Sequence, residues 1–154
     1  GYWSIATHAM APSNVLCAHD GSFAAGLLDS LCQVAIDAAP VLLIAYDSEY
    51  PEPLRAVRPV SDSFAVALVL APEASPRTLA RIDVGLTDAP ATALANTELE
   101  ALRRGNPAAR VLPLLEALAT QRACSVALDY LPDTRLHVDV VLPDAGGVFN
   151  NAAP

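Results

Sequence analysis

Apolar residues return at helical spacing between Gly21 and Asp37, and this pattern predicts a helix over those residues. Pro40 follows closely and cannot continue the helix. The polar side is narrow, which indicates a helix buried at the centre of the fold. The apolar positions are Phe23, Leu27, Leu28, Leu31 and Val34, and the polar ones are Asp29, Gln33 and Asp37.

Short apolar runs flank this helix on both sides. We predict a buried strand at Asn14–Ala18 and a second strand at Val41–Tyr46. The second run is apolar throughout, which is typical of a strand covered on both faces. A strand–helix–strand unit of this length predicts a right-handed parallel crossover.

Further along the chain the apolar pattern becomes alternating. Phe64–Leu70 predicts a third strand and Thr78–Leu86 a fourth. The alternation in the fourth strand indicates that one face meets water, so we expect an antiparallel edge there. The positions expected to face outward are Leu79, Arg81, Asp83 and Gly85.

The C-terminal third predicts a helix and a hairpin. Ala108–Gln121 is amphipathic and tolerates Pro113 only within its first turns. Ser125–Leu131 and Arg135–Leu142 alternate around a Pro-Asp-Thr turn, which predicts two antiparallel strands. One α/β domain over residues 1–142 therefore accounts for the pattern, and residues 143–154 are expected to form a disordered tail.

Two segments lack periodicity. Asp47–Pro59 contains three prolines and predicts a loop with a single helical turn. Thr87–Pro107 is rich in alanine, proline and asparagine, and we expect a variable surface excursion. The chain starts at Gly1 without a methionine or a signal peptide, so we interpret it as a fragment that lacks its N-terminal part.

Composition and charge exclude several classes of function. The net charge is −8 and all nine basic residues are arginine, which leaves no basic face for nucleic acid. Acidic residues interrupt every apolar run before it reaches bilayer length, so we expect no membrane span. Cys17, Cys32 and Cys124 are widely spaced and odd in number, which favours reduced core thiols and a cytoplasmic location.

No cofactor or metal is predicted. Gly146-Gly147 lies in the tail and forms no phosphate-binding loop. His8, His19 and His137 are scattered and make no ligand set for a metal ion.

Candidate chemistry gathers where the first predicted strand meets the helix. Asp20 is either a helix N-cap or a catalytic carboxylate, and His19 either a general base or a structural histidine. With Ser22 these residues contain the types found in a hydrolase triad, but the Gly-x-Ser-x-Gly elbow is absent. Cys17 falls inside the predicted strand, where a thiol is buried and inert.

An aromatic and proline cluster follows the second predicted strand. It comprises Tyr46, Tyr50, Pro51, Pro53 and Leu54. The carboxyl ends of strands in an open sheet are where ligands bind, whereas packing of a surface loop is the alternative explanation.

The Ala11-Pro12-Ser13 turn, the run Cys17-Ala18-His19-Asp20-Gly21-Ser22 and the helix after it resemble the nucleophile region of the β-ketoacyl synthases. On that resemblance Asp20 stands where those enzymes have their nucleophilic cysteine. Their two histidine motifs, His-Gly-Thr-Gly-Thr and Gly-His-x-x-Gly/Asn, are not in the chain. The chain most resembles the β-ketoacyl synthase-like N-terminal and chain-length-factor-like proteins of fatty acid, polyketide and aryl-polyene pathways. The matching residues also include Gly1–Ile5, Pro40–Leu54 and Leu112–Glu116.

The resemblance implies a thiolase-like α/β fold, with a mixed sheet, a buried central helix and an antiparallel edge. It implies an acyltransferase homologue that is catalytically silent and pairs with an active ketosynthase, or with itself, through Asn14–Ala18. Acyl carrier protein would be an indirect partner. Phe23, Tyr46 and Leu54 are the residues expected to shape an acyl pocket. Two alternatives stay open: an acyl-thioester hydrolase or transferase that uses His19 and Asp20, and an acyl-chain binding module.

Overall fold

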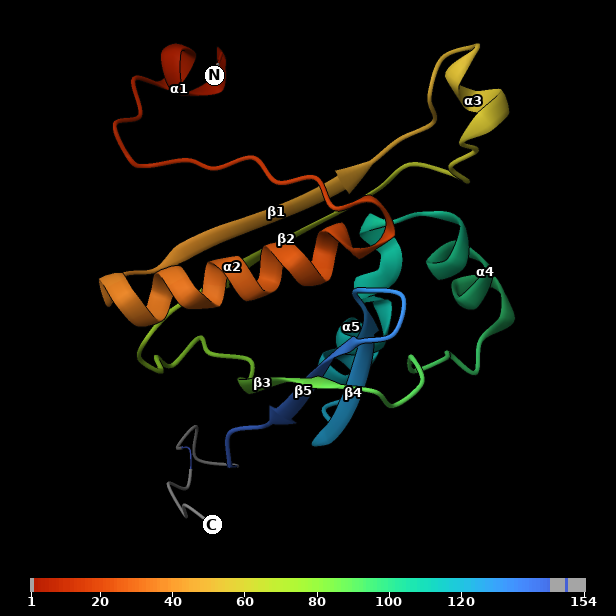
Figure 1. Ribbon diagram of the computed structural model, residues 1–154. Coiled ribbons are helices and arrows are strands. Elements are labelled where there is room, and N and C mark those ends of the chain that lie inside the picture. Colours follow the sequence, from red (N-terminus) through yellow and green to blue (C-terminus); the bar gives the residue numbers. More distant parts are fainter. Residues whose placement is uncertain (1, 145–148, 150–154) are drawn as a thin grey trace.

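The computed structural model describes residues 2–144 and residue 149, with side chains from Ser4 onward. Helices and antiparallel strands are interspersed along the chain, which confirms the mixed α/β class (Figure 1). The elements are α1 (Tyr2–Thr7), η1 (His19–Gly21), α2 (Ser22–Asp37), β1 (Val41–Asp47), α3 (Leu54–Val57), β2 (Phe64–Leu70), β3 (Arg81–Thr87), α4 (Thr97–Gly105), η2 (Ala108–Val111), α5 (Leu112–Ala119), β4 (Cys124–Asp129) and β5 (Arg135–Val141). The tail predicted for residues 143–154 lies mostly outside the described residues.

Helix α2 is the centre of the fold, as its narrow polar side predicts. It begins one residue later than expected and ends where Ala38 adopts a left-handed conformation, with φ of 49°. Phe23 and Leu27 are fully buried in a core cluster that also holds Leu136 and Val138 of β5. Figure 1 shows α2 between the β1–β2 pair and the other three strands. Both sheets are therefore built around this one helix.

The strands form two antiparallel sheets rather than one mixed sheet. One holds β1 and β2, and the other has the order β3-β5-β4. The predicted parallel crossover is wrong, since β1 pairs antiparallel with β2 from Val41↔Leu70 to Asp47↔Phe64. The expected burial of Val41–Tyr46 on both faces is also wrong, because α2 covers only one of them and alternate residues stay exposed.

No strand forms at Asn14–Ala18, which corrects a second prediction. The segment has no regular secondary structure and runs as an open coil in Figure 1, and the side chain of Val15 is 100% exposed. Among the strands that the structure describes, none pairs with this segment, so its backbone has no ladder to join. Because no strand precedes α2, there is no strand–helix–strand unit, and the predicted crossover cannot form.

The three-stranded sheet matches the sequence pattern closely. The predicted hairpin forms as β4 and β5, with Cys124 opposite Val140 and Asp129 opposite Arg135. The expected strand at Thr78–Leu86 begins later, at Arg81, and pairs antiparallel with β5. The helix predicted at Ala108–Gln121 divides into η2 and α5, with Pro113 in the first turn of α5 as expected.

The segment Thr87–Pro107 is not a simple surface excursion. Asn96 caps α4 by accepting hydrogen bonds from the amides of Glu98 and Leu99. At the other end of α4, Asn106 is completely buried and donates to the carbonyl of Asp62 at 2.9 Å. These polar contacts hold the segment against the body of the protein. The sequence did not predict this docking, because polar residues spaced along a loop show no hydrophobic periodicity.

Across the described part of the chain, no helix combines the length and apolar character that crossing a bilayer requires.

Candidate functional site

The turn that enters α2 is compact and closely supported; we call residues 17–22 the elbow. The Ser22 hydroxyl donates to the carbonyl of His19 at 2.7 Å and accepts from the amide of Ala18 at 2.9 Å. His19 has a φ of 53°, a conformation that a non-glycine residue adopts only when its surroundings enforce it. The two hydrogen bonds of Ser22 therefore close the elbow between Ala18 and Ser22.

Gly21 lets the elbow sit directly on the hairpin. A Cβ atom at this position would lie 2.1 Å from the carbonyl oxygen of Tyr130, well inside contact distance. Only glycine fits without displacing backbone. The loop after β4 thus forms the floor of the elbow.

The Asp20 carboxylate is bound by two arginines. Its Oδ1 accepts from Arg58 at 2.5 Å, and its Oδ2 lies 3.6 Å from a guanidinium nitrogen of Arg110 and 3.5 Å from Nδ1 of His19. Partial burial raises the pKa of Asp20, but the hydrogen bond from Arg58 and the charges of Arg110 and Arg58 outweigh it and lower the pKa below its usual value. Neither η1 nor α2 is capped by a side chain at its N-terminus, so the N-cap interpretation of Asp20 is wrong.

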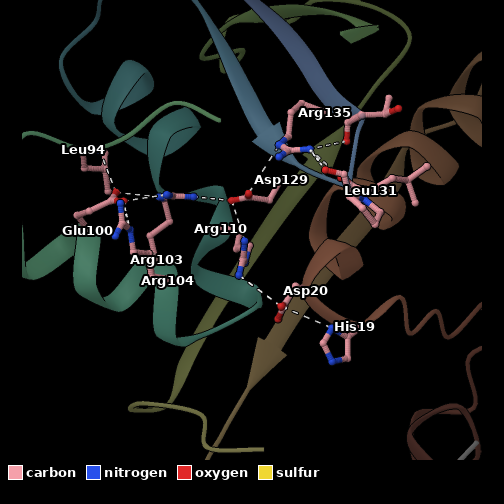
Figure 2. Close-up of polar contacts among 12 residues, drawn as sticks. His19, Asp20, Leu94, Glu100, Arg103, Arg104, Arg110, Asp129, Leu131 and Arg135 are labelled. Atoms are coloured by element: carbon pink, nitrogen blue, oxygen red, sulfur yellow. Dashed lines mark hydrogen bonds and ion pairs between the residues drawn. The ribbon is translucent and has the colours of Figure 1, made fainter. Parts of the chain in front are cut away.

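A chain of ion pairs continues from Asp20 into the protein, as Figure 2 shows. Arg110 also binds Asp129 at 2.9 Å, and Asp129 binds Arg103 at 2.5 Å. Arg103 in turn binds Glu100 at 2.8 Å. We call these five residues, Asp20, Arg110, Asp129, Arg103 and Glu100, the charge relay. It joins the elbow to the end of β4 and to α4.

The charge relay is more buried than surface ion pairs usually are. The Arg103 side chain is only 8% exposed. Hydrogen bonds from Arg103 outweigh the effect of burial and, with those from the Leu94 amide and Arg104, hold the pKa of Glu100 far below its usual value. The hydrogen bond to Glu100 likewise raises the pKa of Arg103. This network was not predicted from the sequence, although the spacing of Glu100, Arg103 and Arg104 on one helix face indicates ion pairs along α4.

A pocket of about 200 Å³ opens beside the elbow. It unites the elbow with the loop after β1, so two regions singled out in the sequence meet here. The lining residues are Cys17, His19, Ser22, Asp47, Tyr50, Leu54, Arg58 and Pro107. The lining combines apolar side chains with residues that carry a thiol, an imidazole, a hydroxyl, a guanidinium and a carboxylate group.

The three residues expected to shape an acyl pocket separate in the structure. Leu54 lines the pocket beside the elbow. Phe23 is 1% exposed within the core and does not line this pocket, and Tyr46 points from the open face of β1 and is 74% exposed. Alternation along β1 explains Tyr46, because its neighbours Ala45 and Asp47 take the covered side.

The prediction of core thiols is wrong for two cysteines. Cys17 and Cys32 are exposed and Cys124 is half-buried, all three as free thiols. Cys17 is exposed because the strand expected around it does not form, and it faces the pocket instead. Within the described residues, no group of three or more histidine, cysteine, aspartate or glutamate side chains is placed to hold a metal ion.

Comparison with known proteins gives one match. A family model described as "Beta-ketoacyl synthase, N-terminal domain" matches residues 1–131. Searches of curated proteins and of solved structures found no match. The matched range includes the elbow, the pocket and the whole of the charge relay.

Proposed function

Because the chain belongs to the β-ketoacyl synthase N-terminal domain family, we propose that it is a catalytically silent, chain-length-factor-like subunit that pairs with an active ketosynthase. Its thiolase-like arrangement is completed in that pair. The partner carries out condensation in a fatty acid, polyketide or aryl-polyene pathway, and this chain helps to shape the acyl cavity.

The observation that carries this proposal is the environment of Asp20. On the family resemblance Asp20 occupies the position of the nucleophilic cysteine, and here its carboxylate is held by Arg58 and Arg110. A carboxylate paired in this way stays ionised and is a weak base. The same pairing argues against a hydrolase mechanism in which Asp20 acts as the general base.

The segment Asn14–Ala18 supports the pairing. None of the described strands pairs with its backbone, and the apolar side chains of Val15 and Leu16 are exposed to solvent. An exposed segment with unpaired backbone groups is suited to adding a strand from another chain. In the proposed complex this segment becomes the shared strand, with a ketosynthase in the heterodimer or with a second copy in a homodimer.

Co-expression with the active ketosynthase encoded nearest to it tests the proposal. Size-exclusion chromatography with mass detection is expected to give a stable one-to-one complex. Val15→Asp should abolish that complex, because it places a charge in the shared strand. Val57→Asp is the matched control, since Val57 is also highly exposed, at 79%, but lies on α3. A lone species, or equal loss of the complex in both variants, contradicts the proposal.

A further inference from the structure

The outer face of the β1–β2 sheet carries no charged side chain and is exposed to solvent. Its six side chains are Leu42, Ile44, Tyr46, Ala65, Ala67 and Val69. We propose that this face pairs with the same face of a second copy of the chain. The interface is separate from Asn14–Ala18, the segment that joins a ketosynthase in the proposed function, so the two interfaces can be tested independently.

The relief of this face is self-complementary. Strand β1 supplies a row of three large side chains, at Leu42, Ile44 and Tyr46, whereas β2 places an alanine directly opposite two of them. Ala65 lies opposite Tyr46, and Ala67 lies opposite Ile44. The face therefore consists of a ridge along β1 and a shallow trough along β2.

A two-fold axis that runs along the strands, between the two copies, fits each ridge into the other trough. Such an axis sets β1 of one copy over β2 of the other, so that Ile44 meets Ala67 of the second copy. An axis across the strands would set ridge against ridge. Sheets that pack face to face interdigitate their side chains, and a symmetric dimer uses the same patch on both subunits. The relief thus points to a second copy of this chain as the occupant.

Charge favours contact through this face over contact elsewhere. The chain carries a net charge of −8, so two copies repel each other at long range. Pairing through the outer face of β1–β2 buries no acidic or basic group. Salt screens the long-range repulsion. Self-association should therefore strengthen as the salt concentration rises, whereas an interface held by ion pairs would weaken.

The open area of the face predicts how strong the pairing is. The exposed fractions of its four larger residues lie between 57% and 74%. Together with the two alanines they leave roughly 500 Å² of apolar surface uncovered. Two copies would bury about 1,000 Å², which is near the lower limit for a specific interface. We therefore expect a dimer at high protein concentration and a monomer at low concentration.

Sedimentation equilibrium of the whole chain, at several protein concentrations and at low and moderate salt, tests the proposal. A monomer–dimer equilibrium that strengthens with salt is expected. Ala67→Leu should weaken it by about tenfold or more, because each interface then holds two added side chains in its troughs. Gly85→Leu is the matched control, since it adds an apolar group to the outer face of the other sheet, where a Cβ atom meets nothing within 4 Å.

A compensating variant separates shape from simple hydrophobicity. Ile44→Ala flattens the ridge and should weaken the pairing by itself. Combined with Ala67→Leu, it moves the large side chain from β1 to β2, so the ridge and the trough match again. The double variant should regain most of the lost affinity. Stronger association of Ala67→Leu than of the wild type, a double variant no better than the single ones, or a monomer at every concentration overturns the inference.

Val15→Asp distinguishes this interface from the one in the proposed function. It should abolish the complex with the ketosynthase and leave self-association unchanged, while Ala67→Leu should have the opposite effects. Complete loss of self-association in Val15→Asp would place the second copy at Asn14–Ala18 and overturn this inference. Failure of the wild-type chain to bind a ketosynthase refutes only the proposed function.

Discussion

The two sheets differ in the faces that they turn away from the core. The outward face of the β1–β2 sheet consists only of apolar side chains, at Leu42, Ile44, Tyr46, Ala65, Ala67 and Val69. The outward face of the three-stranded sheet carries polar groups, including Asp83, Ser125, His137 and Asp139. There Asp139 accepts from the Ser125 hydroxyl and lies 3.1 Å from Nε2 of His137.

This difference shows that an alternating burial pattern does not by itself identify a solvent-facing sheet. The inner faces of both sheets pack into the same hydrophobic core cluster, yet only the three-stranded sheet has a polar outer face. Exposed apolar patches of this kind mark surfaces that become covered in an assembly. Substitutions at exposed positions on the two outer faces allow their effects on stability and association to be compared directly.

The largest effect is expected from the helix that both sheets share. Phe23→Ala should lower the free energy of unfolding by about 3–5 kcal/mol, because it opens a cavity in the common core. Tyr46→Ala is the control on the outer face of β1 and should cost less than about 1 kcal/mol. Urea denaturation followed by circular dichroism measures both. Similar losses in the two variants would show that the outer face of β1 is already covered.

The next effect concerns the charge relay, which fastens the three-stranded sheet to the elbow. Asp129→Ala removes the carboxylate shared by Arg103 and Arg110 and leaves their buried charges undercompensated, at a cost of about 3 kcal/mol. Asp83→Ala, on the polar outer face of the same sheet, should change the stability by less than about 0.5 kcal/mol. Thermal unfolding of both variants provides the measurement. A stable Asp129→Ala protein would mean that the relay does not hold the sheet in place.

Acid should weaken the same network. The pKa values of Asp20 and Glu100 are lowered in the folded protein, so the unfolded chain binds more protons at low pH. The stability that these groups contribute is present above their ordinary pKa values and is lost as pH falls below them. Unfolding midpoints measured from pH 7 down to pH 3 should therefore decline.

Glu100→Gln should flatten that decline. Glu98→Gln should leave it unchanged, because Glu98 is an exposed residue on the same helix. An identical pH profile for wild type and Glu100→Gln would rule out Glu100 as the source.

The smallest effect on stability distinguishes the two outer faces. Ile44→Lys and Gly85→Lys each add one positive charge, the first to the apolar face and the second to open space on the polar face. Each should change the stability by less than about 0.5 kcal/mol. Only Ile44→Lys should suppress association of the isolated chain at high concentration, as measured by static light scattering. Equal behaviour of the two variants would show that the apolar face does not drive association.

The sequence predicted the helices and strands better than it predicted which strands pair with each other. Helix α2, strand β2, and the β4–β5 hairpin followed from local periodicity, because each pattern is decided by residues close in the chain. The pairing of β1 with β2 did not follow, since a continuously apolar run looks the same whether its second face is covered or open. The segment Asn14–Ala18 carries a strand-like pattern without a strand beside it.

The candidate site was predictable in its positions but not in its contacts. Asp20, His19 and Leu54 were singled out and do lie at or beside one pocket. The pairing of Asp20 with Arg58 and Arg110 joins residues 38 and 90 positions apart, and no local rule connects them. Burial of Cys17 was inferred from a strand, so it failed together with that strand.

The order β3-β5-β4 sets a sequence of events for the nascent chain. The last strand to leave the ribosome is the middle one, so β3 and β4 have no ladder to join until Val141 has been made. Helix α2 and the β1–β2 pair emerge earlier and have their partners sooner. The Tyr130 carbonyl that supports Gly21 belongs to the late hairpin. On a translating ribosome the elbow therefore lacks the backbone that packs against Gly21 until the chain has been made as far as Tyr130.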